Sequence, residues 1–234
     1  MFRIDHTSTL RGDAKRHAIA TAALTLFRER GFDAVTMREV AAAAGVATGA
    51  AYYYFPSKES LVLDYYDGVQ NRHRAAVVAA LKDDSVTTLE FRLRAVLQTK
   101  LDLVSPDRRL LGALFRYVAE PTHPLSIFGE ATRKTRDHAV ATFALAIQGE
   151  NLPSPLDTLA PRAAWLTHLG LLLYLVADTS PEQCRTRRLA DRAACLLATA
   201  LTFARLPGAS VALTPLTEAL REAGLLPSST LETP

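Results

Sequence analysis

Hydrophobic residues recur along this chain with the spacing of amphipathic helices. Over residues 13–30, alanine, leucine and phenylalanine fall three or four positions apart, and Gly31 follows as a natural helix stop. No stretch of strand length alternates between apolar and polar residues, and runs of β-branched residues are rare. The pattern therefore predicts an all-α protein.

Glycines, prolines and capping residues divide the chain into successive predicted helices. Four are expected over 13–30, 36–44, 48–55 and 57–82, with Ser57 as the N-cap of the fourth. Five further ones are expected over 88–104, 106–120, 125–148, 156–178 and 181–206, and a last short one over 215–223. The break near Asp83 separates three short helices and a fourth, bridging helix from the set of long helices that follows. We therefore expect an N-terminal domain over 1–60, a bridging helix over 61–83, a larger helical domain over 84–206, and a short helix and tail over 207–234.

Composition narrows the class of protein. The 234 residues are 49% hydrophobic and 22% charged, which is enough apolar material to bury a core and excludes an intrinsically disordered chain. The formal net charge of +3 is compatible with a polyanionic partner but does not identify one. Cys184 and Cys195 have no CxxC spacing and no histidine cluster, so neither a disulfide framework nor a zinc site is expected.

Neither the N-terminal residues nor the longest apolar stretch indicates a membrane protein. The first residues lack the apolar core of a signal peptide. The longest apolar stretch, 165–177, has thirteen residues, which is too short to span a bilayer and fits a buried core helix. We therefore expect a cytoplasmic protein without a membrane partner.

The segment 36–59 has the pattern of a helix-turn-helix. Ala41 supplies the small side chain needed where two helices cross, and Gly45 suits a sharp left-handed turn without a Cβ penalty. Val46 is expected to fill the corner between the two helices, as in DNA-reading motifs of this spacing. The three tyrosines at 52–54 point about 100° apart on a helix, so at least one must lie at the surface.

The segment from Arg11 to Leu63 resembles the DNA-binding region of the TetR (tetracycline-repressor-like) transcriptional regulators. The matching residues are Ala22, Leu26, Phe27, Gly31, Phe32, Thr36, Val40, Ala41, Ala44, Gly45 and Val46, followed by Gly49, Tyr52, Tyr54, Phe55, Ser57, Lys58, Glu59 and Leu61. Two positions depart from the family pattern. Ala47 stands where serine is common, and Ala51 stands where a larger aliphatic residue usually packs.

The resemblance implies a set of DNA-contacting residues. They are Thr36, Arg38, Ala47, Thr48, Gly49, Ala50, Tyr52, Tyr53, Tyr54 and Lys58. Thr36, Tyr52, Tyr54 and Lys58 would contact phosphates, whereas residues 47–50 and Tyr53 would face base edges. Three alternatives stay open: Tyr52 could belong to the core, Lys58 could be a solvated cap residue, and Arg38 could be surface charge only.

Over 84–206 the resemblance is architectural, and it implies a helical domain for effector binding and dimerisation. The helices 156–178 and 181–206 would form a four-helix interface with a second copy of the chain. The first of them is apolar nearly all round from Trp165 onward, which requires burial on more than one side. The alternative is a helix at the centre of a monomeric bundle.

The candidate effector-binding residues combine aromatic side chains with a few polar ones, as ligand cavities do. They are Phe115, Arg116, Tyr117, Glu120, His123, Trp165 and His168. Such a lining favours an uncharged or mildly polar hydrophobic effector. Two alternatives stay open: His168 could be a core or dimer-interface histidine, and Arg116 could form a surface ion pair with Glu120.

These observations predict a ligand-responsive transcriptional repressor that binds a palindromic DNA operator as a homodimer and is released by a small-molecule effector. The alternative is an architectural DNA-binding protein or helical adaptor without ligand control. The sequence does not decide between repressor and activator. It contains no GxSxG, P-loop, GxGxxG or HExxH motif, so we expect no enzymatic activity, no cofactor and no metal site.

Overall fold

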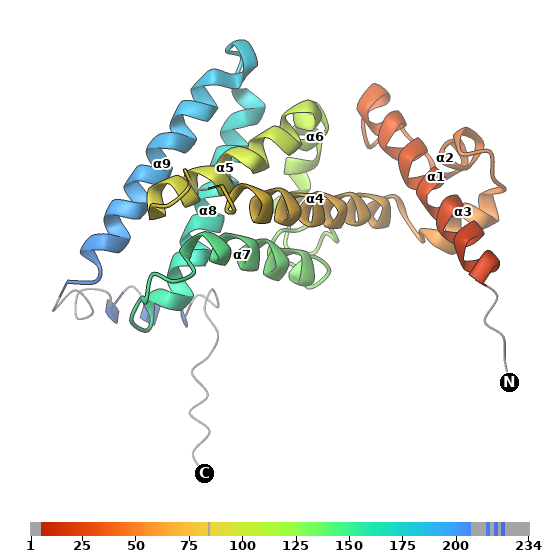
Figure 1. Cartoon of the computed structure of the whole chain (residues 1–234). Coiled ribbons are helices and arrows are strands. Elements are labelled where there is room, and N and C mark those ends of the chain that lie inside the picture. Colours follow the sequence, from red (N-terminus) through yellow and green to blue (C-terminus); the bar gives the residue numbers. More distant parts are fainter. Residues whose placement is uncertain (1–5, 84, 207–213, 216–217, 220, 223–234) are drawn as a thin grey trace, which may run out of the picture. The chain divides into compact units, whose positions relative to one another are not determined.

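The computed structural model describes residues 6–83, 85–206, 214–215, 218–219 and 221–222 (Figure 1). Every regular element within these residues is helical, which confirms the all-α prediction. The α-helices are α1 (His6–Arg30), α2 (Met37–Ala43), α3 (Thr48–Tyr54), α4 (Lys58–Ala80), α5 (Leu89–Val104), α6 (Arg108–Val118), α7 (Arg133–Ile147), α8 (Leu156–Ala177) and α9 (Cys184–Phe203). Two short 3₁₀ helices, η1 (Ser105–Asp107) and η2 (Pro181–Gln183), precede α6 and α9.

The chain separates into two compact units by its internal contacts. The first comprises Met1–Arg74, Asp102–His138 and Leu175–Ala177, and the second comprises Ala75–Leu101, Ala139–Tyr174 and Asp178–Pro234. The first unit therefore joins α6 to α1–α3, although residues 55–107 separate α3 from α6 in the chain. The domain boundaries at residues 60, 83 and 206 stay predictions, because grouping by contact does not test independent folding.

The core of the first unit forms around two phenylalanines of the α1–α2 region. Phe27 and Phe32 pack edge to face with ring centroids 5.3 Å apart, and both are buried. Between them Gly31 adopts a φ of +84°, a left-handed conformation that glycine enters freely, so α1 ends where the sequence predicts. The other buried members are Ile19, Ala23, Val35, Met37, Val40, Ala41, Ala51, Phe55, Leu61 and Val62, together with Leu110, Leu114 and Leu125.

The second unit contains the end of α4, most of α5, α7 and α8, and the whole of α9. On α9 the buried residues Thr186, Ala190, Ala194 and Ala198 recur every four positions, which defines one packed face. Asp178 accepts hydrogen bonds from the backbone N–H of Thr186 at 2.8 Å and from its hydroxyl at 2.7 Å, which fixes the loop that leads into α9. By length and composition α8 could cross a membrane, but half of its most apolar window is buried inside the chain.

Some predicted helix boundaries are wrong. The helix expected from residue 125 begins at Arg133, because the preceding segment folds into turns: the Ser126 N–H donates to the His123 carbonyl at 2.9 Å, and the Thr132 hydroxyl donates to the Ser126 carbonyl at 2.6 Å. The first helix begins at His6 instead of residue 13. Gly12 therefore lies inside the helix, where a glycine costs only about 1 kcal/mol relative to alanine and does not end it. Of the helix expected over 215–223 the structure describes residues 215, 218–219 and 221–222, which are helical, and the other four residues lie outside the described part.

Candidate nucleic-acid interface

The turn between α2 and α3 has the geometry that its residue types predict. Gly45 adopts a φ of +66°, and the Val46 N–H donates to the Ala41 carbonyl at 3.0 Å, which closes the turn. Ala41 and Ala51 are both buried, so small side chains allow the two short helices to approach closely. Ala47 is the N-cap of α3 and makes no side-chain capping hydrogen bond, which is the consequence of lacking the family's serine.

The helix α3 exposes one face and packs the other. Tyr53 is 82% exposed and Tyr52 50%, and Thr48 and Gly49 are also exposed. At about 100° per residue these four positions cover one contiguous arc of the helix. The remaining candidate DNA-contacting residues on or beside this helix are exposed Ala47 and half-buried Ala50 and Tyr54. The side chain of Tyr52 is therefore half outside the core, and Phe55 is buried as expected.

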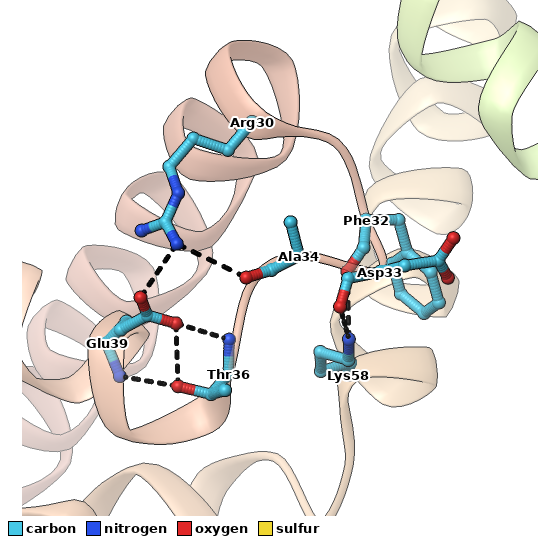
Figure 2. Close-up of polar contacts among 7 residues, drawn as sticks. All are labelled: Arg30, Phe32, Asp33, Ala34, Thr36, Glu39 and Lys58. Carbon is cyan, nitrogen blue, oxygen red and sulfur yellow. Dashed lines mark hydrogen bonds and ion pairs between the residues drawn. The ribbon is translucent and has the colours of Figure 1, made fainter.

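Figure 2 shows the polar network that fixes the start of α2. The Thr36 N–H and hydroxyl both donate to Glu39 Oε2, at 2.8 and 2.7 Å, and the Glu39 N–H donates to the Thr36 hydroxyl oxygen at 3.3 Å. This reciprocal arrangement is a capping box. Arg30 adds hydrogen bonds to Glu39 Oε1 at 2.8 Å and to the Ala34 carbonyl at 3.2 Å. A phosphate could reach the donors of Thr36 only in exchange for Glu39.

The electrostatics of Glu39 follow from these contacts. The hydrogen bonds from Thr36 and Arg30 lower the pKa of Glu39 to about 2, so the carboxylate is ionised at neutral pH. Its negative charge lies beside the predicted phosphate-contacting position Thr36, and Arg30 compensates it.

Lys58, the first residue of α4, binds the turn between α1 and α2. Its Nζ donates to the Phe32 carbonyl at 2.8 Å and the Asp33 carbonyl at 3.3 Å, and lies 4.7 Å from the centroid of the Phe32 ring (Figure 2). Ser57 is the N-cap of α4, since its hydroxyl oxygen accepts from the Ser60 N–H at 3.3 Å. The ammonium of Lys58 is thus engaged within the chain instead of being merely solvated, and its predicted phosphate contact stays a prediction. Arg38 is exposed on α2.

Three of the candidate effector-binding residues meet at the same α1–α2 turn. Arg116 forms an ion pair with Asp33, and the Tyr117 hydroxyl donates to that carboxylate as well. The Tyr117 ring stacks on His123 with centroids 4.3 Å apart and packs edge to face on Phe32 at 5.7 Å. The carboxylate that pairs with Arg116 is therefore that of Asp33, and the expected alternative partner, Glu120, is exposed.

The other candidate effector-binding residues lie elsewhere. Trp165 and His168 are buried in α8, where His168 Nδ1 lies 3.3 Å from the Trp165 carbonyl oxygen and the His168 ring lies 5.3 Å from that of Phe143. They belong to the second unit, whereas half-buried Phe115 belongs to the first. Within the described residues no group of three or more histidine, cysteine or acidic side chains could hold a metal ion.

Sequence reasoning missed two parts of this site. The capping box was readable from the spacing Thr36-x-x-Glu39. The second part is a buried junction around Asp107, which accepts from Arg28 Nε at 2.6 Å, from the second guanidinium nitrogen of Arg28 at 3.0 Å, and from the Tyr65 hydroxyl at 2.8 Å. Arg28 and Asp107 are 79 residues apart, and no local pattern pairs them.

Replacing Thr36 by alanine is expected to lower the free energy of unfolding by about 1 kcal/mol through loss of the N-cap, whereas serine should preserve it. The pKa of Glu39 is lower in the folded state than in the unfolded chain. The stabilisation that the ionised Glu39 carboxylate contributes is therefore present above about pH 4.3 and is lost as pH falls towards 2. Urea unfolding without DNA, from pH 7 to pH 3, measures both effects. Equal stability of the alanine and serine variants at pH 7 would contradict the prediction.

Comparison with known proteins places these features in a family. The family model for bacterial regulatory proteins of the tetR family matches residues 19–65, and that for the tetracyclin repressor-like C-terminal domain matches residues 92–216. The second match alone covers more than half of the chain.

Curated relatives and solved structures agree with the family models. The transcriptional repressor KstR2 of Rhodococcus jostii is 40% identical over 37% of this chain and 42% of its own length. The transcriptional regulator TtgR of Pseudomonas putida is 31% identical over 64% of this chain and 72% of its own length. The chain spans half or less of the length of several curated relatives that it matches.

Two solved structures show the same fold. A TetR-family regulator from Rhodococcus sp. superposes with a TM-score of 0.60 at 21% identity, over 80% of this chain and 99% of that one. Thermus thermophilus FadR, a repressor solved with lauroyl-CoA, has a TM-score of 0.59 at 21% identity, over 79% of this chain and 93% of that one. These proteins are transcriptional regulators and not enzymes. The helix-turn-helix of α2 and α3, the all-helical fold and both family matches lead to one conclusion: the chain belongs to the TetR family of transcriptional regulators.

Proposed function

We propose that this protein is a homodimeric transcriptional repressor that binds a palindromic operator and is released from it by a small-molecule effector. The observation that carries DNA binding is the exposed face of α3, since Thr48, Gly49, Tyr52 and Tyr53 leave one side of a short helix uncovered. A helix of this kind enters the major groove when the rest of the motif packs behind it. Thr36, Arg38 and Lys58 would add phosphate contacts around the groove.

A second copy of the chain is the partner that suits α8 and α9. Leu189, Leu196 and Phe203 recur every seven residues on α9 and are all exposed, with Leu196 70% and Phe203 63% exposed. On α8 Leu166 and Leu173 follow the same spacing. We call these five residues the apolar stripe. Large exposed apolar patches are rare on monomeric proteins. A second copy related by a two-fold axis would bury the apolar stripe, and it would also present two copies of α3 to one operator.

Effector release requires that the DNA-binding helices respond to the regulatory helices. Within the first unit α6 contacts the α1–α3 region near both of its ends, through Asp107 with Arg28 at the start and through Arg116 and Tyr117 with Asp33 near the end. An effector that binds one arrangement of these helices better than the other would lower DNA affinity, and bound DNA would lower effector affinity by the same factor. Trp165 and His168, which both belong to the second unit, would line its site, and their character favours a hydrophobic effector with few charges.

We place the protein in the cytoplasm, where DNA and effector are both present. An architectural DNA-binding protein without ligand control is the alternative. It shares the α3 face but would show no release by any compound.

Selection of duplexes from a random pool by the purified protein tests the proposal. The expected result is enrichment of an inverted repeat whose half-sites are about one helical turn apart, and protection of such a site in DNA flanking the protein's own gene. A thermal-shift screen of hydrophobic compounds, followed by release of the selected duplex, then tests effector control. Failure to enrich any sequence would overturn the proposed function.

A further inference from the structure

The exposed face of α3 carries almost none of the groups that read bases through paired hydrogen bonds. Its sequence, Thr-Gly-Ala-Ala-Tyr-Tyr-Tyr, contains no arginine, lysine, amide or carboxylate side chain. Paired recognition of guanine requires arginine or lysine, and that of adenine requires an amide side chain. The polar atoms that α3 offers from its exposed side chains are the hydroxyls of Thr48, Tyr52 and Tyr53. Most of the surface that this face can place against base edges is therefore apolar.

Among the four bases only thymine presents an apolar group in the major groove, its C5-methyl. An aromatic ring pressed against that methyl removes apolar surface of both partners from water. Tyr53 is the residue placed to do this, because it is 82% exposed, the largest exposed fraction among the large hydrophobic side chains of α3.

The Tyr53 ring is also supported from behind. It lies edge to face on Tyr54, with ring centroids 5.1 Å apart. Tyr54 is half-buried, packs against the core, and places its hydroxyl 3.5 Å from the position that a Cβ on Gly12 of α1 would occupy. The Tyr53 ring thus lies against a packed neighbour. This contact limits the conformations of the ring, so less entropy is lost when the ring is ordered on DNA.

We propose that Tyr53 recognises the C5-methyl of one thymine in each operator half-site, so that this position is distinguished by an apolar contact and not by a hydrogen bond. The inference rests on the proposed function and adds the chemical class of the recognised base. It assigns the discrimination to the ring of Tyr53, with its hydroxyl dispensable for this step.

Deoxyuridine provides the test, because it keeps the hydrogen-bonding edge of thymine and lacks only the methyl group. In the duplex selected by the wild-type protein, each thymine of the half-site is replaced in turn by deoxyuridine, and the dissociation constant is measured by fluorescence anisotropy. One position is expected to weaken binding by about 4-fold when changed in one half-site and about 15-fold when changed in both, as for one buried methyl group per half-site.

Three variants separate the ring from the hydroxyl and from its neighbour. Tyr53→Ala should bind the thymine and deoxyuridine duplexes equally, because the partner of the methyl is gone. Tyr53→Phe and Tyr52→Ala should both keep the penalty for deoxyuridine at that position. Circular dichroism confirms that each variant is folded before its binding is compared.

The possible results decide the proposal. An equal deoxyuridine penalty in the wild type and Tyr53→Ala would overturn it, as would the absence of a penalty at every thymine of an enriched operator. Loss of the penalty in Tyr53→Phe would overturn it in favour of hydrogen bonding by the hydroxyl. If no duplex is enriched at all, the proposed function fails and the inference falls with it, which is distinguishable from an operator that is bound without a methyl contact.

Discussion

Replacing Leu196 by glutamate is expected to convert the protein from a dimer into a monomer and to weaken operator binding by more than about 100-fold. Leu196 is the most exposed member of the apolar stripe, and it lies midway between Leu189 and Phe203 on α9. Burying an unpaired carboxylate in an apolar interface costs several kcal/mol, and two-fold symmetry repeats the cost in the second copy. A monomer would then hold only one half-site and would lose the avidity of paired binding.

Analytical ultracentrifugation measures the oligomeric state of this variant, and anisotropy on the selected operator measures its affinity. Gln148→Glu is a matched control, because it adds the same charge at an exposed position of the second unit outside the apolar stripe. The control should remain dimeric and bind as the wild type does. A Leu196→Glu variant that stays dimeric would show that α9 does not form the interface.

Replacing Asp107 by alanine should lower the free energy of unfolding by about 2–3 kcal/mol, the largest loss of stability that we expect from one polar side chain. Asp107 is only 5% exposed and accepts hydrogen bonds from Arg28 of α1 and Tyr65 of α4. Without it the buried Tyr65 hydroxyl loses its acceptor and the Arg28 guanidinium loses its counter-charge. Asp107→Asn keeps the shape and one acceptor oxygen, so its loss should be intermediate. Urea unfolding at pH 7 measures both variants.

The pH dependence provides a second test of Asp107. Burial by itself raises the pKa of this carboxyl, but the hydrogen bonds from Arg28 and Tyr65 outweigh burial and hold the pKa below its ordinary value. Its stabilisation is therefore fully present above about pH 4 and is lost as pH falls through the folded-state pKa. The difference in stability between the wild type and Asp107→Asn should shrink from pH 5 to pH 3. A constant difference over that range would contradict the assigned ion pair.

Much of the helix-turn-helix was predictable, because its determinants are local. Ala41 and Gly45 are four residues apart, and the small side chain and left-handed turn that they provide are properties of single positions. The exposure of at least one tyrosine also followed from helix geometry alone. The DNA-contacting roles of Thr48, Gly49, Tyr52 and Tyr53 came from resemblance to the family and stay predictions, while the placement of these four residues on one uncovered face is a property of the fold.

The regulatory side was less predictable. The chain segment before α7 was predicted to be helical because no glycine or proline break was assigned after residue 124, yet hydrogen bonds among Ser126, His123 and Thr132 hold it in turns. Arg116 and Tyr117 were predicted to bind an effector because aromatic and polar groups together resemble a cavity lining. In the structure both engage Asp33, and a pattern of residue types cannot distinguish a ligand's carboxylate from one supplied by the same chain.

By itself the sequence determined the helical class of this protein, the α2–α3 turn and the segment that reads DNA in its family, since each depends on residues within a few turns of helix. Only the tertiary structure decided which partners the charged groups take: Lys58 on the carbonyls of the α1–α2 turn, Arg116 on Asp33, and Arg28 on Asp107. The physical reason is that hydrophobic periodicity and turn chemistry act between neighbours in the chain. An ion pair instead depends on where packing brings two distant backbones together.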